Sequence, residues 1–216
     1  MLSAPATRFN FEMDAEYFRD FPAPIMESVH ENHFTIINST IPFFGPMLYF
    51  MMRSLGCEQV LEIGLAEAYT GFYMAHAIKD NATRYQMPGN RYYGIDIGLQ
   101  TVAVDNLKKA NLPAVCYEMD SMRLPGPLEG ITFDLIFQDG CHDKEHVVYE
   151  FETMYPQLKG NGMGYWIAHD CFGDTLRNAV EGVDEIIRRI KAGQYNMEYC
   201  RIWDIYGLAV FRKMDA

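Results

Sequence analysis

Residues 59–71, QVLEIGLAEAYTG, contain the transition that decides the fold. The run QVLEI at 59–63 is short and apolar, which predicts a buried β-strand. Small residues follow at 64, 66 and 68, and the sequence over 70–79 then predicts a helix. A buried strand that leads through a tight turn into a helix is the building unit of an α/β fold with a mostly parallel sheet.

The same alternation continues along the chain from residue 45. Further strands are predicted at 91–97, 114–119, 132–138 and 163–168, and helices at 46–55, 99–110, 143–158 and 174–192. Two last strands, at about 198–203 and 207–212, lie close together and could pair as a hairpin. We therefore predict an α/β fold: a Rossmann-like, doubly wound, seven-stranded and mostly parallel sheet with a C-terminal antiparallel hairpin.

The length and charge of the chain limit the kinds of protein that it can be. With 216 residues, 49% of them apolar, it can form one globular domain with a sizeable core. Eighteen lysines and arginines against 29 aspartates and glutamates give a net charge of −11. Such a field repels phosphate backbones and anionic lipids, so we expect neither nucleic acid nor a membrane as a partner. No apolar stretch is as long as a membrane span.

The cysteines indicate the compartment. There are five, an odd number with wide spacing and no CxxC pair. This pattern disfavours a disulfide framework and a structural zinc site, and it predicts a cytoplasmic protein. Residues 1–20 also lack a basic segment followed by an apolar one, so we expect no signal peptide.

The chain divides at about residue 45. Residues 1–45 are rich in aromatic side chains and are interrupted by Pro22, Pro24 and Pro42. We interpret them as an N-terminal extension of a single domain at 46–216. The aromatic residues could anchor the extension on the core, line a substrate pocket as a lid, or form a homodimer contact.

Ligands of such folds bind at the edge where the parallel strands end. After the first predicted strand, the small residues Gly64 and Ala66 would let a ligand approach the backbone, although the dinucleotide motif GxGxxG is absent. After the second strand, Asp96 could accept both hydroxyls of a ribose or cap a turn. After the third, Asp120 and Ser121 could bind an adenine edge or form a turn.

Acidic residues also follow the fourth and fifth predicted strands. Asp139 and Asp170 would converge if these strands are neighbours, and two close carboxylates repel unless a cation or a proton lies between them. A divalent ion with oxygen ligands, most simply Mg²⁺, fits such a pair. His142 would face the same cleft, and an imidazole side chain is suited to general base catalysis near neutral pH. Alternatively, His142 caps its helix and Asp170 caps a turn.

A second metal pattern overlaps this one. In HDKEH, His142 and His146 are four residues apart, as in HExxH zinc sites, with aspartate in place of glutamate. Such a site needs a third ligand and a glutamate-like base, and His142 lies at the strand-to-helix junction. We therefore interpret His146 as a surface or packing residue and do not favour a zinc hydrolase.

Five segments at the strand ends resemble class I S-adenosylmethionine (SAM)-dependent methyltransferases, and their order along the chain matches as well. The segments are VLEIGLAEAYTG, YYGIDIG, CYEMDS, FDLIFQDGCHDKEHVVYEF and GMGYWIAHD. Within that class, the DG-x-H segment and the HD pair resemble the small-molecule O-methyltransferases, including the macrolide-sugar O-methyltransferases and the cephalosporin-hydroxylase-like group. The closing GLAVFRK resembles the terminal antiparallel strand of that class, so the resemblance spans about residues 45–213.

The resemblance implies an enzyme that binds SAM and methylates a hydroxyl group of a small molecule, with help from a divalent metal. It assigns Glu62 and Gly64 to the methionine part of the cofactor, Asp96 to the ribose, and Asp120 and Ser121 to the adenine. Ala66 and Asp139 complete the expected cofactor site.

For the chemical step, the resemblance implies metal ligands at Asp139 and Asp170 and a general base at His142. His169, the first residue of the HD pair, is a third candidate ligand of the metal. The chain departs from the family pattern at Ala68, where glycine is usual. A methyl group is tolerated there if φ is negative, but it could crowd the cofactor. Gln138 and Cys141 are further departures.

Two other functions stay open. A non-catalytic module that binds SAM for regulation would keep the pocket without turnover, and Ala68 is its main support. A nicotinamide-dependent oxidoreductase could use a similar fold, although the missing GxGxxG argues against it.

Overall fold

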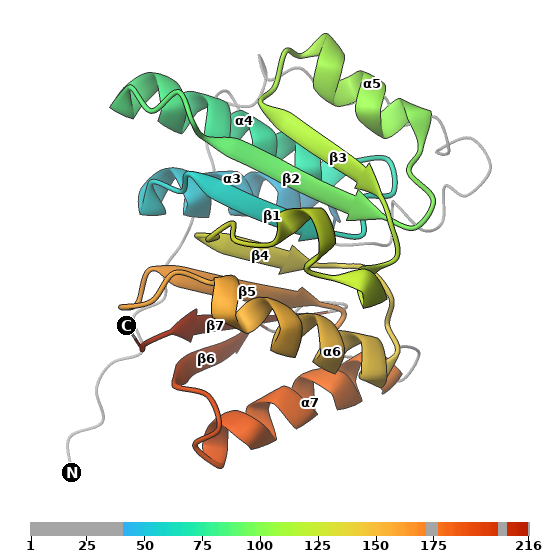
Figure 1. The fold of residues 1–216 in the computed structure, drawn as a ribbon, viewed down its shortest axis with the longest axis vertical. Helices are drawn as coiled ribbons and strands as arrows, with labels where there is room; N and C mark the ends of the chain where they lie inside the picture. Colours follow the sequence, from blue (N-terminus) through green and yellow to red (C-terminus); the bar gives the residue numbers. More distant parts are fainter. Residues whose placement is uncertain (1–40, 172–176, 203–206, 216) are drawn as a thin grey trace.

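The structure, a computed structural model, describes residues 41–171, 177–202 and 207–215. Its helices and strands alternate as predicted (Figure 1). The helices are α3 (Ile41–Leu55), α4 (Tyr69–Tyr85), α5 (Thr101–Lys109), α6 (Lys144–Met154) and α7 (Arg177–Lys191). The strands are β1 (Gln59–Ile63), β2 (Arg91–Asp96), β3 (Ala114–Glu118), β4 (Leu135–Gln138), β5 (Gly164–His169), β6 (Met197–Ile202) and β7 (Leu208–Lys213).

The described residues form one seven-stranded sheet with the order β3-β2-β1-β4-β5-β7-β6. The strands β1 to β5 pair in parallel, whereas β7 is antiparallel to both β5 and β6. The predicted fold class and C-terminal hairpin are confirmed. The strand order reverses between β1 and β4, and at such a switch point the neighbouring strand-to-helix loops diverge and leave a crevice at the carboxyl edge.

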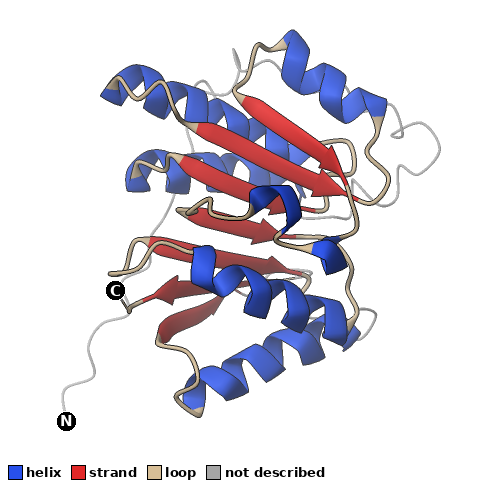
Figure 2. Cartoon of the chain, in the orientation of Figure 1, coloured by secondary structure: helices blue, strands red, loops and turns tan. Residues whose placement is uncertain are grey.

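Helices cover both faces of the sheet (Figure 2). Alternate residues of the central strands point to opposite faces, as strand geometry requires. Ile63 and Ile136 pack with α6 and α7 in one apolar cluster, and Val60 and Phe137 pack with α3 and α4 in the other. The sheet is therefore buried on both faces, which explains why its central strands are continuous apolar runs.

The predicted boundaries of three helices were wrong. Helix α6 ends at Met154, where the 3₁₀ helix Tyr155–Gln157 follows, and not at residue 158. Helix α3 includes residues 41–45, which we had assigned to the extension, and Pro46 lies inside it. A proline removes one backbone N–H and here does not end the helix. Helix α4 continues to Tyr85 because Asn81, an unfavourable helix residue, is buried and donates from Nδ2 to the carbonyls of Met52 and Cys57. The rest of the predicted extension, residues 1–40, lies outside the described residues.

Among the described residues, no helix combines the length and the apolar character that a membrane span requires.

Candidate functional site

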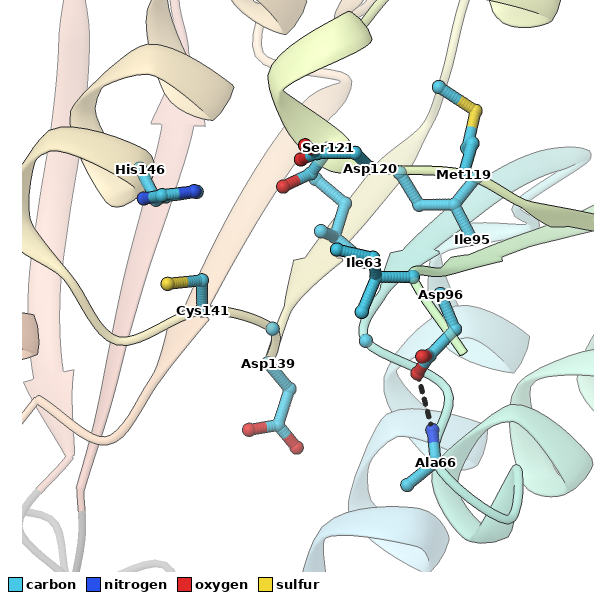
Figure 3. A pocket seen from close by; sticks show the side chains of 13 residues that line it. Ile63, Ala66, Ile95, Asp96, Met119, Asp120, Ser121, Asp139, Cys141 and His146 are labelled. Atoms are coloured by element: carbon cyan, nitrogen blue, oxygen red, sulfur yellow. Dashed lines mark hydrogen bonds between the residues drawn. The ribbon is translucent and has the colours of Figure 1, made fainter. Parts of the chain in front are cut away.

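A cavity of about 420 Å³ opens at the carboxyl edge of the sheet, at the switch point between β1 and β4 (Figure 3). Residues at the ends of β1, β2, β3 and β4 form its wall. They are Ile63, Gly64, Ala66, Ile95, Asp96, Ile97, Met119, Asp120, Ser121, Asp139, Gly140, Cys141 and His146. The position is the one that the fold class predicts for a ligand.

Gly64 brings two strand ends into close contact at the base of this cavity. Its φ is +90°, a conformation that glycine adopts without steric cost. A side chain at this position would also collide with the backbone of Asp139 and Gly140. The loop after β1 therefore passes directly against the loop after β4, and only glycine fits between them.

Asp96 holds the loop after β1 in place. Its Oδ2 accepts hydrogen bonds from the backbone N–H groups of Leu65 and Ala66, both at 2.9 Å. Figure 3 shows the bond from Ala66. Its Oδ1 accepts from Gly98 N at 2.9 Å. These contacts compensate the carboxylate with three N–H groups and keep it at the cavity wall.

Asp120 and Ser121 form a turn, which is one of the two roles that the sequence left open. The side chain of Asp120 accepts a hydrogen bond from Met122 N at 2.9 Å and caps the 3₁₀ helix Ser121–Arg123, so it forms a turn. Both residues also line the cavity. Turn formation fixes the position of the wall at the end of β3.

Glu62 lies behind the cavity wall, fully buried among α4 and β2, and is not one of the lining residues. Thr70 and Tyr92 donate hydrogen bonds from their hydroxyls to its carboxyl group. Burial raises the pKa of Glu62 to about 8, although these hydrogen bonds oppose the shift. In this structure the carboxyl group ties β1 to β2 and to the first turn of α4.

A second group of polar residues adjoins the cavity at Asp139. Ligand atoms of Asp139, His142 and Asp170 lie within 4.8 Å of one another. His142 Nδ1 is 3.2 Å from Asp170 Oδ2. The ends of the neighbouring strands β4 and β5 thus bring together two carboxylates and one imidazole.

His169 lies beneath the two carboxylates. Its Nδ1 is 2.9 Å from Asp139 Oδ1 and 3.2 Å from Asp170 Oδ1, and its ring packs edge-on against Phe44. Burial by itself would lower the pKa of His169, but the carboxylates of Asp139 and Asp170 outweigh it and raise the pKa to about 10. The imidazolium therefore supplies a positive charge between the carboxylates at neutral pH.

The donor atoms of this group fit a divalent cation. The two carboxylates of this group suit Mg²⁺, which prefers oxygen ligands and keeps part of its water shell. Asp139 and Asp170 would hold the ion, with His142 beside them as the predicted base. His169, which we had expected as a ligand, contacts the carboxylates from the buried side and orients them.

The cavity brings together six of the seven residues that the sequence assigned to the cofactor, all except Glu62: Gly64, Ala66, Asp96, Asp120, Ser121 and Asp139. The apolar lining residues Ile63, Ile95 and Met119 were not predicted, although each directly precedes or follows a residue that was. His146 also lines the cavity. The sequence singled it out only through the HDKEH pattern, and we had interpreted it as a surface or packing residue.

The condition under which a methyl group at Ala68 was expected to be tolerated, a negative φ, is not met. Ala68 has a φ of +59°, in the left-handed region. The methyl group is fully buried in the cluster beneath α4, and Ala68 does not line the cavity. Its side chain therefore does not crowd a ligand there.

A family model described as a methyltransferase domain matches residues 61–171, just over half of the chain. The chain belongs to this methyltransferase domain family. The matched segment runs from β1 to the end of β5, so it includes the cavity and the carboxylate group. The prediction of a methyltransferase is confirmed. No curated protein matches the chain.

Solved structures resemble the methyltransferase over nearly its whole length. The O-methyltransferase TomG from Streptomyces achromogenes, in complex with SAM, has a TM-score of 0.66 at 16% identity and covers 92% of this chain and 95% of its own. The O-methyltransferase from Bacillus cereus, in complex with S-adenosylhomocysteine (SAH), has a TM-score of 0.62 at 16% identity. The match covers 92% of this chain and 96% of the Bacillus chain. The SAH-bound methyltransferase PaMTH1 from Podospora anserina has a TM-score of 0.61 at 16% identity, and the match covers 93% of each chain. At these identities the likeness shows the fold.

The raised pKa of the buried Glu62 carboxyl group should make the stability of the protein depend on pH. Between pH 4.5, the ordinary pKa of a glutamate, and about 8, the folded protein keeps this proton while the unfolded chain loses it. The free energy of unfolding therefore falls as pH rises, by up to about 1.4 kcal/mol per pH unit for this group. Glu62→Gln should flatten this dependence when urea unfolding is measured from pH 5 to pH 8.

Glu129→Gln, at an exposed turn, is the matched control and should leave the slope unchanged. Glu150, whose pKa burial raises to about 7, adds a slope of the same sign that both variants keep. If the free energy of unfolding of Glu62→Gln falls with pH as steeply as that of the wild type, the pKa of Glu62 is not raised in the folded protein.

Proposed function

We propose that the methyltransferase transfers the methyl group of SAM to a hydroxyl of a small molecule, assisted by a divalent cation, most simply Mg²⁺. The observation that carries this proposal is the position of Asp139, which belongs both to the cavity wall and to the group with His142 and Asp170. A cofactor in the cavity and a cation on this group would be immediate neighbours. The SAM and SAH complexes of TomG and the Bacillus cereus enzyme support the choice of cofactor.

The cofactor would extend across the strand ends. In this proposal Gly64 and Ala66 face its methionine part, with Glu62 supporting their loop from behind. The carboxylate of Asp96 accepts hydrogen bonds from the ribose hydroxyls, and Asp120 and Ser121 border the adenine. The apolar side chains of Ile95 and Met119 suit the faces of the purine ring.

The acceptor would bind on the other side of Asp139. Asp139 and Asp170 would hold a divalent cation, which would lower the pKa of a hydroxyl group bound to it. His142 takes the hydroxyl proton: Asp170 accepts from its Nδ1, which leaves Nε2 as the basic nitrogen. His169 holds both carboxylates in position. Because the sulfonium already activates the methyl group, the remaining task of the protein is alignment for in-line attack.

Charge and cysteine content bear on the partners of the enzyme and on its compartment. The charge of −11 argues for a small acceptor and against nucleic acid or anionic membranes. The odd number of widely spaced cysteines favours the cytoplasm. The aromatic N-terminal extension, without the residues 41–45 that belong to α3, is proposed as a lid or a homodimer contact.

Calorimetric titration with SAH, with and without Mg²⁺, tests the cofactor. We expect the wild type to bind SAH in both conditions. Asp96→Asn should raise the Kd about 10- to 150-fold, because a hydrogen bond to a charged group contributes about 1.5–3 kcal/mol. Glu129→Gln should bind like the wild type. If the wild type does not bind SAH in either condition, the cavity is not a SAM site.

Replacement of His142 tests the general base. With SAM and a panel of hydroxylated small molecules, His142→Ala should lower kcat for the accepted substrate about 10²- to 10⁴-fold. The Kd for SAH should stay that of the wild type, because His142 does not line the cavity. Turnover equal to that of the wild type would rule out this role.

Metal removal tests the cation. We expect EDTA to abolish turnover and Mg²⁺ to restore it in the wild type. Asp170→Asn should lose the response to Mg²⁺, whereas the residual activity of His142→Ala should keep it if His142 is a base and not an essential ligand. Turnover that is insensitive to EDTA would contradict metal assistance.

A further inference from the structure

A second cluster of potential metal ligands lies beside the cavity, separate from the group with Asp170. Its members are Cys141, Asp143 and His146, whose ligand atoms all lie within 4.8 Å of one another. Cys141 and Asp143 are in the loop after β4, and His146 is in the first turn of α6. Figure 3 shows Cys141 and His146 next to each other on the α6 side of the cavity.

The local fold separates the two histidines that form the HDKEH pattern. His142 approaches Asp170, at 3.2 Å, and belongs to the carboxylate group. His146 lies one helical turn later and joins Cys141 and Asp143 instead. The two histidines thus belong to different groups of potential ligands, and the group with His146 offers sulfur, oxygen and nitrogen atoms.

The donor atoms of this triad suit zinc better than magnesium. Thiolate and imidazole are ligands of Zn²⁺, whereas Mg²⁺ takes oxygen. Zinc bonds of about 2.0–2.3 Å at tetrahedral angles place ligand atoms roughly 3.3–3.8 Å apart. A shift of about 1 Å brings the triad to these separations, and the exposed side chains of Cys141 and Asp143 have room to make it. Water would complete the tetrahedron.

We propose that Cys141, Asp143 and His146 form a Zn²⁺ site at the wall of the cavity and that its occupation weakens cofactor binding. Cys141 and His146 both line the cavity, so Zn²⁺ bound to them adds one net positive charge there, because the Cys141 thiol releases its proton, and it brings a bound water. The charge opposes the sulfonium of SAM, and the ion with its water takes up space that the cofactor needs. The metal site stands on its own geometry, whereas its effect on the cofactor rests on the proposed function.

Cobalt is the probe for the metal site, because tetrahedral Co²⁺ absorbs strongly in the visible and a thiolate ligand adds a charge-transfer band in the near-ultraviolet. We expect both signals in the wild type, in excess Mg²⁺ to occupy the oxygen-rich group, and their loss when Zn²⁺ is added. Cys141→Ser should lose the thiolate band and His146→Ala should bind Co²⁺ more weakly. Cys200→Ser, at an exposed cysteine on β6, is the matched control and should keep the full spectrum.

Calorimetric titration with SAM tests the effect on the cofactor. With excess Mg²⁺ present, one equivalent of Zn²⁺ should raise the Kd about tenfold in the wild type and in Cys200→Ser, within the usual range of coupling between two sites. In Cys141→Ser the Kd should be the same with and without Zn²⁺. A Kd in the wild type that does not respond to Zn²⁺ would overturn the coupling.

The two proposals fail in different ways. Absence of the thiolate band from the wild type, or its presence in Cys141→Ser, would overturn the zinc site whatever the cofactor does. If SAM does not bind even without Zn²⁺, the proposed function fails, and the cobalt spectrum still decides the metal site.

Discussion

The close crossing of two strand ends is the constraint on which the site depends. At the end of β1, Gly64 N donates to Ile95 O at 2.9 Å, and Asp139 N donates to Ile63 O at 2.8 Å. These bonds extend the sheet by one step on both sides of β1. They leave no space for a side chain at residue 64, because its backbone lies against that of Asp139 and Gly140. The cavity wall and the carboxylate group are both fixed by this contact, because Asp139 belongs to each.

The acidic groups around this crossing are stabilised in three different ways. Backbone N–H groups compensate Asp96. The imidazolium of His169 compensates Asp139 and Asp170. Glu62, which has only hydroxyl partners, has a pKa raised to about 8 by burial. Three separate means of compensation let several carboxyl groups lie close together without strong mutual repulsion.

The sequence predicted the sheet and its functional edge well, because both depend on local patterns. Apolar runs bounded by small or polar residues mark the strands, and parallel strands end at a common edge. Asp139 and Asp170 could be brought together from the sequence because β4 and β5 are neighbours. The position of Asp96 followed from the same argument.

The errors arose where tertiary contacts override local preference. Asn81 continues α4 because its buried side chain satisfies carbonyls of α3 and the loop after it, contacts that no local pattern reveals. Whether His146 pairs with His142 or Cys141 depends on side-chain directions at a loop-to-helix junction. A spacing of four residues does not fix these directions, because helical geometry begins only after the first histidine.

The loop after β1 shows why a family departure at Ala68 need not disturb the cavity. Ala66 and Ala68 both have positive φ, at +45° and +59°, which costs an alanine about 1–2 kcal/mol each. At Ala68, burial of the methyl group beneath α4 offsets part of this cost. At Ala66, which is exposed, the compensation is the hydrogen bond from its N–H to Asp96. The loop conformation and the carboxylate of Asp96 therefore depend on each other, so a ligand that draws this carboxylate toward itself also changes the energy of the loop.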